Sequence, residues 1–362
     1  MKLLHCGDFH LDAKMETGLD PIRARERRVE LLLTFSRVVE TAVELGVDAI
    51  LLAGDLFDTE RVTDKTRRYV GDVISAHPSI SFLFVAGNHD KNVPPLFEGN
   101  SAPDNWHAFP ADGWDCVSLG ESVVVSGTSA LDQPNIFEQL PSPEPDAFHI
   151  VLLHGQLVRG NQAGQERIPL GRLSHRGIRY LALGHEHTFR SEPLDEGGMW
   201  AYAGCPEGRG FDECGEKGCI LIDTDKKDKD MISFLPLAKR TLHLVSVALD
   251  DCAGFGDVLA AVSSAVSDLA ATDMVKVVLT GEVSPELTRD TVHLTQHLSE
   301  RFYFARVKDD CRLRLNPEDY VGDVSLKGEF IRSVLASRLS ENEKQRVITC
   351  GLRALRGEEV DA

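Results

Sequence analysis

Short apolar runs along the chain each stop at a small group of polar residues. Five runs have the length of a buried strand, and each is followed by glycine or histidine together with other polar residues. The five groups are Gly7-Asp8-Phe9-His10, Gly54-Asp55, Gly87-Asn88-His89-Asp90, His154-Gly155 and Gly184-His185-Glu186-His187. In open α/β sheets, ligands bind beyond the carboxyl ends of the strands. The pattern therefore predicts that strand ends bring these polar side chains into one crevice.

Apolar residues at spacings of three and four predict two helices between these strands. The first covers residues 26–46, and Gly46 stands where a C-cap glycine is expected. Its apolar stripe is formed by Leu32, Phe35, Val39 and Val43. The second helix covers residues 63–76, with Thr63 or Asp64 as its N-cap.

The pattern changes after His187. Three apolar stretches are expected to form short strands of an antiparallel sheet: residues 199–204, 217–225 and 231–237. From about residue 242 a β-α-β-α-β order predicts a small α+β domain, and the last segment predicts two amphipathic helices. We therefore expect a large α/β domain over residues 1–240, a small α+β domain over 241–325 and C-terminal helices over 326–362.

Composition agrees with a globular protein of two domains. The chain has 362 residues, of which 42% are hydrophobic and 27% charged. No apolar run approaches the roughly 18 residues of a membrane helix, and the first residues do not resemble a signal peptide, so we expect a cytoplasmic protein with reduced cysteines. The net charge of −18 argues against a simple nucleic-acid binder. Locally, however, residues 157–190 carry six arginines and only two acids.

The strand-end side chains form a mixed set of metal ligands. They are Asp8, His10, Asp55, Asn88, His89, His154, His185 and His187. Carboxylates, imidazoles and an amide oxygen without a thiolate suit Mn²⁺, with Fe²⁺ and Zn²⁺ as alternatives. The set is too large for one ion and fits two ions that share a bridging carboxylate. On an extended segment, Asp8 and His10 would point the same way and hold one ion.

In this order, the motifs D-x-H, GD, GNHD, H and GHxH resemble the signature of the calcineurin-like metallophosphoesterases. Within this superfamily, the chain resembles the SbcD-like DNA-repair exonucleases more closely. It has their sequence GDLFD at residues 54–58, and it has Thr59-Glu60 where Ser/Thr phosphatases have Arg-Gly. The segment YAGCPEGRGFDECGEKG, residues 202–218, resembles a compact bacterial branch of that group. The resemblance implies a four-layer α/β/β/α sandwich with a small C-terminal α+β cap domain.

The resemblance also implies a role for each residue. Asp8, His10 and His187 would hold one ion; Asn88, His154 and His185 would hold the other; Asp55 would bridge them. A water activated by both ions would attack phosphorus in line. His89 would not bind metal but would contact the phosphate and protonate the leaving oxygen, while Asp90 would orient its ring. Asp12 and Asp58 are expected either to hold metal-bound histidines or to serve as surface and turn residues, and His5 is expected to be a packed strand residue.

Three functions remain open on the sequence. The first, favoured by GDLFD and the arginine-rich stretch, is a manganese-dependent 3′-to-5′ DNA exonuclease or endonuclease. Its expected partners are DNA, an SbcC-like coiled-coil ATPase and a second copy of the chain, with no membrane involved. The second, favoured by the acidic charge, is a phosphodiesterase or phosphatase for cyclic nucleotides or other small phosphate esters. The third is a non-catalytic scaffold, which the complete ligand set disfavours.

Overall fold

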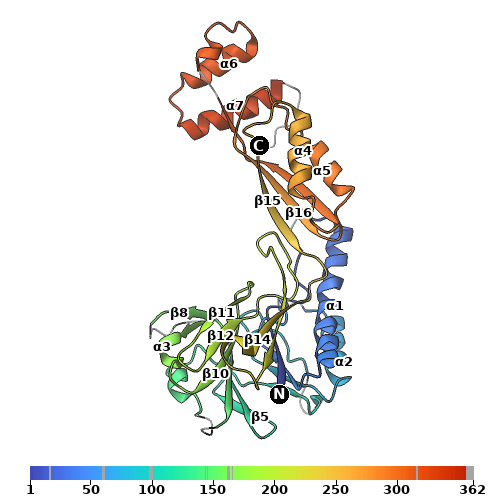
Figure 1. The fold of residues 1–362 in the computed structure, drawn as a ribbon, viewed down its shortest axis with the longest axis vertical. Helices are drawn as coiled ribbons and strands as arrows, with labels where there is room; N and C mark the ends of the chain where they lie inside the picture. The colour runs from blue at the N-terminus through green and yellow to red at the C-terminus, as the bar shows by residue number, and fades with distance from the viewer. Residues whose placement is uncertain are drawn as a thin grey trace. The chain divides into compact units, whose positions relative to one another are not determined.

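The computed structural model describes residues 1–15, 18–58, 62–97, 101–142, 144, 146–160, 164, 166–314 and 317–355. Thr59 and Glu60, noted above, lie outside the described residues. The chain divides into two compact units, Met1–Leu242 and His243–Ala362 (Figure 1). In the described part of the chain, no helix combines the length and the apolar character needed to cross a bilayer.

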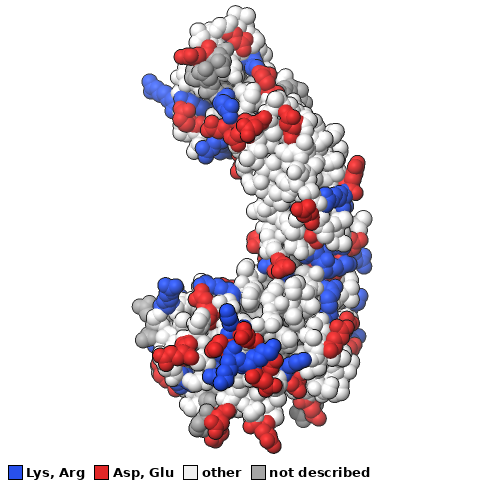
Figure 2. Space-filling view, viewed as in Figure 1, with Lys and Arg blue, Asp and Glu red and all other residues white. Residues whose placement is uncertain are grey.

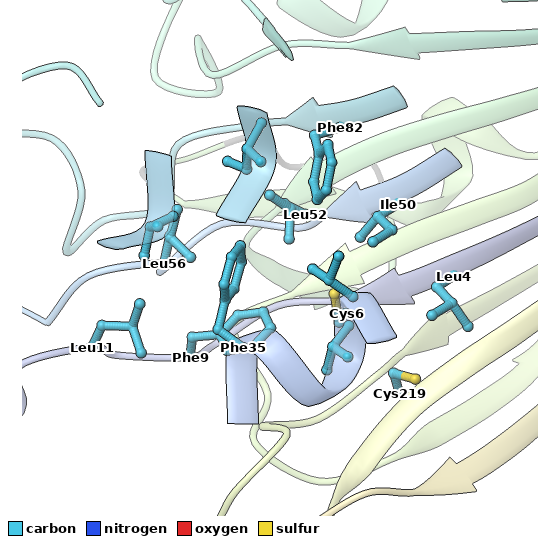
Figure 3. Packing of buried hydrophobic residues seen from close by; sticks show 14 of the residues in the cluster. Leu4, Cys6, Phe9, Leu11, Phe35, Ile50, Leu52, Leu56, Phe82 and Cys219 are labelled. Atoms are coloured by element: carbon cyan, nitrogen blue, oxygen red, sulfur yellow. The ribbon is translucent and has the colours of Figure 1, made fainter. Parts of the chain in front are cut away.

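The first sheet of the first unit has six strands and is buried on both faces around its centre. Its order is β14 (Ile232–Pro236), β13 (Gly218–Asp223), β1 (Lys2–Cys6), β2 (Ala49–Leu52), β3 (Ser81–Phe84) and β4 (Trp106–Ala108). Strands β1 to β4 run parallel. Alternate side chains of a strand face opposite ways. Leu4 and Cys6 pack toward Phe35 of helix α1 (Pro21–Leu45) (Figure 3), while Leu3 belongs to the apolar cluster shared with the second sheet. Burial on both faces explains why the predicted strands read as continuous apolar runs.

The second sheet packs against the first through a shared apolar layer. Its order is β11 (Arg190–Pro193), β12 (Met199–Tyr202), β10 (Ile178–Gly184), β7 (Phe148–His154), β6 (Val123–Gly127) and β5 (Asp115–Leu119). Ile150 and Tyr180 of this sheet share a buried cluster with Leu51 of the first. Its other face is covered by the short helix α3 (Leu170–Leu173) and the 3₁₀ turn η2 (Ile136–Gln139). The predicted mixed α/β sandwich is confirmed, with a thin fourth layer.

The three stretches after His187 form strands, as predicted, but they are divided between the two sheets, and only β13 and β14 pair with each other in the expected antiparallel way. Strand β12 runs parallel to β10 in the second sheet, with Tyr180 opposite Met199. Strands β13 and β14 instead extend the first sheet, and β13 pairs antiparallel with β1. Hydrophobic periodicity and composition indicate that a segment forms a strand. They do not indicate which strand it pairs with, because pairing depends on burial against residues far away in the chain.

The helix ends follow their local signals more closely than the helix faces do. Gly46 ends α1 in the left-handed conformation (φ +63°), as predicted. Thr63 is the N-cap of α2 (Asp64–Ser75), and its side chain accepts a hydrogen bond from the Thr66 N–H. The predicted stripe of α1 is partly wrong, because Val43 is exposed. The buried face instead includes Arg27 and Glu30, a charged pair that the apolar pattern concealed.

The second unit is built on a three-stranded sheet, β15 (Leu242–Ala248), β16 (Met274–Thr280) and β18 (Phe304–Asp309). Helices α4 (Phe255–Ala265) and α5 (Thr291–Ser299) contribute to its core. Short strands β17 (Glu282–Val283) and β19 (Arg312–Leu313) form a parallel pair. Helices α6 (Leu326–Leu335) and α7 (Glu341–Leu355) also belong to this unit, because Ile331 and Ile348 are buried in the same apolar cluster.

Candidate metal centre

The five polar groups of the first unit lie where parallel strands end. Asp8, Asp55 and Asn88 follow β1, β2 and β3, which are neighbours in the first sheet. His154 ends β7, and His185 follows its parallel neighbour β10 in the second. Backbone hydrogen bonds tie these ends together, from Asp8 N–H to Gly54 O (2.9 Å), from His10 N–H to Asp55 O (2.9 Å) and from Gly155 N–H to Gly184 O (3.1 Å). The predicted convergence of the strand ends is present.

The backbone at the ligands is not extended, contrary to the expectation for the D-x-H motif. Asp8, His10, Asp55 and His185 have positive φ angles of 53°, 45°, 49° and 109°. Such angles are uncommon for residues other than glycine and cost free energy. Asp8 and His10 therefore meet through a tight left-handed turn rather than through strand alternation. Close packing adds a second constraint, because a Cβ at Gly87 would overlap the carboxylate of Asp55.

One group of ligand atoms comes from Asp8, His10 and His187, all within 4.8 Å of one another. The Nδ1 of His10 lies 3.1 Å from Asp58 Oδ1, and the Nδ1 of His187 lies 2.7 Å from Glu213 Oε1. Each Nδ1 therefore donates to a carboxylate, which leaves a lone pair on each Nε2. These two Nε2 atoms face each other at 3.2 Å. Two nitrogen ligands with bonds of about 2.1 Å to one cation would lie roughly 3 to 3.5 Å apart, so the pair fits a shared cation.

A second group consists of acceptors around His154. Its Nδ1 donates to the carbonyl oxygen of Ala53 at 2.8 Å, so its Nε2 carries a lone pair. That Nε2 faces Asn88 Oδ1 at 3.0 Å and Asp55 Oδ2 at 3.4 Å. The His185 ring lies beside the His154 ring, with centroids 5.4 Å apart. Acceptors that face one another are stabilised by a cation between them, so this group fits a second ion.

Asp55 lies between the two groups. Its Oδ2 is 3.4 Å from His154 Nε2 and 3.6 Å from His10 Nε2. Its Oδ1 accepts a hydrogen bond from the backbone N–H of His89 at 2.9 Å. A single carboxylate oxygen that faces histidines of both groups occupies the position expected of a bridging ligand.

Burial makes ionisation of the carboxylates in this centre unfavourable unless cations are bound. Burial raises the pKa of Asp8 well above its usual range, and the negative charge of Asp55 raises it further. Burial also lowers the pKa of His10 and of His154, which favours the neutral imidazoles that metals bind. Bound cations would reverse the penalty on Asp8 by supplying the opposite charge.

His89 lies at the rim of the centre, with 40% of its side chain exposed. Its ring packs edge-on against the His10 ring at a centroid distance of 4.7 Å. Its Nδ1 lies 2.7 Å from the carbonyl oxygen of Asp58 and 3.9 Å from the carboxylate of the same residue. The ring is therefore held by Asp58 at its Nδ1 edge and stays partly exposed at the rim.

The expected role of Asp90 requires correction. Its buried carboxylate accepts hydrogen bonds from the backbone N–H groups of Gly87 (3.0 Å), Phe57 (3.0 Å) and Leu56 (3.3 Å). It therefore fixes the loops after β2 and β3, and the orienting contact to the His89 ring comes from Asp58 instead. Burial raises the pKa of Asp90 to about 7. The sequence placed Asp90 next to His89 but did not show which backbone groups it would meet.

The structure separates the two aspartates whose roles the sequence left open. Asp58 holds His10 and His89, whereas Asp12 accepts hydrogen bonds from Thr63 N–H (2.8 Å) and Thr66 Oγ1 (2.9 Å) at the start of α2. His5 is a packed strand residue, as predicted, and its ring bonds to the Tyr180 hydroxyl at 2.8 Å.

Sequence reasoning missed Arg209 and Glu213, which hold the far side of His187. Both lie in the glycine-rich segment of residues 202–218, which was noted only as a whole. An arginine and a glutamate four residues apart could have marked this segment as part of the site, but the pairing with His187 depends on the tertiary fold.

Comparisons with known proteins agree with this geometry. The sequence pattern of the family described as calcineurin-like phosphoesterase matches residues 1–189. The DNA double-strand break repair protein Mre11 of Saccharolobus solfataricus is 27% identical over 270 residues, which cover 68% of this chain and 66% of that protein. The uncharacterized metallophosphoesterase YhaO of Bacillus subtilis is 27% identical over 247 residues, 63% of this chain and 58% of that one. The match thus spans less than two thirds of the length of these relatives.

Among solved structures, TT1561 of Thermus thermophilus aligns with 65% of this chain and 98% of its own, at 15% identity and a TM-score of 0.43.

Proposed function

We propose a DNA-cleaving activity for this chain, which belongs to the calcineurin-like phosphoesterases and is therefore a metal-dependent phosphoester hydrolase with a dinuclear centre. The proposed substrate is DNA. The proposed reaction is 3′-to-5′ exonuclease or endonuclease cleavage of the SbcD type, and the proposed native metal is Mn²⁺. The observation that carries it is the similarity to Mre11 proteins, whose name describes repair of DNA double-strand breaks.

We also propose the ligand roles expected from the sequence, and the contacts of Asp8, His10, His187, Asn88, His154 and Asp55 support them. Asp8, His10 and His187 would hold one ion, Asn88, His154 and His185 the other, and Asp55 would contact both. When bound, the two cations supply a water of lowered pKa as nucleophile and neutralise charge on the phosphoryl oxygens. Asp58 and Glu213 orient His10 and His187 so that their Nε2 atoms face each other, where they would hold the ion.

His89 is the residue best placed to handle the leaving group. Its Nδ1–H donates to the Asp58 carbonyl oxygen, which leaves Nε2 as the ring nitrogen that would meet a substrate. The Asp58 carboxylate, 3.9 Å away, offers a counter-charge to a protonated imidazole. His89 would therefore contact the phosphate and donate a proton to the departing sugar oxygen.

The acidic residues do not form one continuous surface on the face shown in Figure 2. On the faces shown in Figure 2, basic and acidic side chains intermingle on each unit, and no single acidic field covers either one. The net charge of −18 is the observation that favours the second candidate, a phosphodiesterase or phosphatase for small phosphate esters.

One panel of substrates tests the proposal. The purified chain is incubated with Mn²⁺ and linear duplex DNA, single-stranded DNA, a cyclic nucleotide or bis-p-nitrophenyl phosphate. We expect cleavage of both DNA substrates, and we expect the D55N variant, prepared in parallel, to be inactive, which excludes a contaminating nuclease. Turnover of the small esters alone would overturn the DNA assignment and support the second candidate.

We also propose two macromolecular partners, an SbcC-like coiled-coil ATPase and a second copy of the chain. For the ATPase, the support is a group of exposed apolar side chains at the start of α6 and just before it: Val321, Val324 and Leu326. For the second copy, it is the exposed apolar side chains Ile22, Val29 and Leu33 on α1. Light scattering tests the dimer: the L33E variant should have half the mass of the wild type, and equal monomeric masses would refute it.

A further inference from the structure

Arg209 contacts both carboxylates that hold the candidate ligands His10 and His187. Its Nη1 lies 3.2 Å from Asp58 Oδ1, and its Nη2 lies 2.6 Å from Glu213 Oε1. Its Nε donates to the same glutamate at 3.1 Å. The side chain is 18% exposed, so the guanidinium is largely shielded from water.

Each of these carboxylate oxygens is shared between the arginine and a histidine. Asp58 Oδ1 accepts from Arg209 and also from the Nδ1 of His10 at 3.1 Å. Glu213 Oε1 accepts from Arg209 and also from the Nδ1 of His187 at 2.7 Å. The planar guanidinium thus fixes the separation of two oxygens, and each oxygen fixes one imidazole.

The linkage joins segments that are far apart in the chain. His10 follows β1 in the first sheet, and His187 follows β10 in the second, 177 residues later. The segment that carries Arg209 also bonds to the main chain of His187, because Lys217 Nζ donates to its carbonyl oxygen at 2.7 Å. Two ionised carboxylates beside a centre that already contains Asp8 and Asp55 would repel each other, and the arginine supplies the compensating charge.

We propose that Arg209 is a positioning residue that sets the spacing of His10 and His187 and thereby the affinity of the Asp8–His10–His187 group for its cation. Within the described part of the chain, Arg209 forms no hydrogen bond or ion pair with the Asn88–His154–His185 group, whose His154 is held by the Ala53 carbonyl instead. Loss of Arg209 therefore weakens one of the two ions selectively. The inference rests on the proposed dinuclear function but concerns metal binding, not the choice of substrate.

The experiment is calorimetric titration of the metal-free full chain with Mn²⁺. We expect two binding events in the wild type. In R209M one event should weaken by about 10- to 100-fold, as is typical when a partner of a metal-bound histidine is removed, and the other should be retained. The affinity of R209K for this ion should lie between those of the wild type and R209M, because lysine keeps the positive charge but cannot bond to both carboxylates in the way that a planar guanidinium does. R176M is the matched control, since the Arg176 guanidinium donates to main-chain oxygens of Phe137 and Leu140, away from the ligands.

Two further readouts separate positioning from general damage. Raising Mn²⁺ should restore the activity of R209M toward its wild-type maximum, so the activation constant changes more than kcat does. If R209M does not fold, E213Q tests the same linkage and should weaken the same ion. Unchanged isotherms in folded R209M, or equal weakening of both ions, would overturn the proposal. Selective loss of one ion in a chain that cuts no DNA would uphold it while refuting the nuclease assignment.

Discussion

The Nε2 atoms of His10 and His187 face each other at 3.2 Å, although 177 residues separate them. Because both Nδ1 atoms donate to carboxylates, the two Nε2 atoms of the neutral rings meet as lone pairs. A cation between them would turn a repulsive contact into two coordination bonds. The folded state should therefore be stabilised strongly by divalent metal.

We expect chelation to lower the melting temperature and Mn²⁺ to restore it. A ligand at 100 times its dissociation constant stabilises the folded state by about 2.7 kcal/mol, which differential scanning fluorimetry resolves. H187A should lose part of the response, and Ca²⁺, which prefers oxygen ligands, should give a smaller one. A melting temperature that does not respond to Mn²⁺ would contradict the dinuclear site.

Asp55→Asn should weaken both ions together. The Oδ2 atom faces His10 and His154 at 3.6 and 3.4 Å, so one substitution removes negative charge from both groups. Metal analysis after gel filtration should show occupancy well below two ions, and activity should be lost, because both ions depend on this carboxylate. Retention of one ion at full occupancy would show that Asp55 serves a single ion.

His89→Gln should keep both ions and lose most activity. The ring lies at the rim, and its Nδ1 bonds to the Asp58 carbonyl, so its removal leaves the inner acceptors in place. The loss of a general acid costs about 10²- to 10⁴-fold in rate. A substrate with a good leaving group, such as bis-p-nitrophenyl phosphate, should suffer less, because its departure needs no proton. Loss of metal from H89Q would identify His89 as a ligand instead.

Asp90→Ala should destabilise the loops that carry the site without releasing the His89 ring. Three backbone N–H groups lose their acceptor, and each buried unsatisfied group costs about 1 to 3 kcal/mol. Urea unfolding should show a decrease of this order, larger than that of the exposed control E44Q. Equal stabilities of D90A and the wild type would mean that water replaces the carboxylate.

Glu30 should make the first unit sensitive to acid. Burial alone raises the pKa of this carboxyl, but hydrogen bonds from Arg240, Lys239 and Arg27 outweigh it and lower the pKa to about 2. The folded form thus binds the proton more weakly than the unfolded chain, whose pKa is near 4.5. The stabilisation is complete above about pH 5 and is lost as the pH falls toward 2.

A shift of this size corresponds to about 3 kcal/mol. Urea unfolding between pH 3 and 7 should show a decrease at low pH that is smaller in E30Q, while E44Q on the same helix should follow the wild type. Parallel pH profiles for E30Q and the wild type would show that Glu30 contributes nothing to the acid sensitivity.

The sequence alone determined the features that depend on neighbouring residues. Apolar runs that end in glycine and ligand residues marked the strands and the positions of Asp8, Asp55, Asn88 and His154. Gly46 and Thr63 marked helix ends, because caps act within one turn of the chain. The ligand types also implied a cation before any distance was known.

Only the tertiary structure decided which distant groups would meet. The sheet that β13 joins, the left-handed turns at Asp8 and His10, and the contacts of Asp58, Asp90 and Glu213 depend on packing between segments far apart in the chain. Such contacts leave no period or spacing in the sequence, because a carboxylate can reach its partner from any loop that the fold brings within about 3 Å. Arg209 shows this most clearly: the sequence contained it, and the fold gave it two carboxylates and, through them, two histidines.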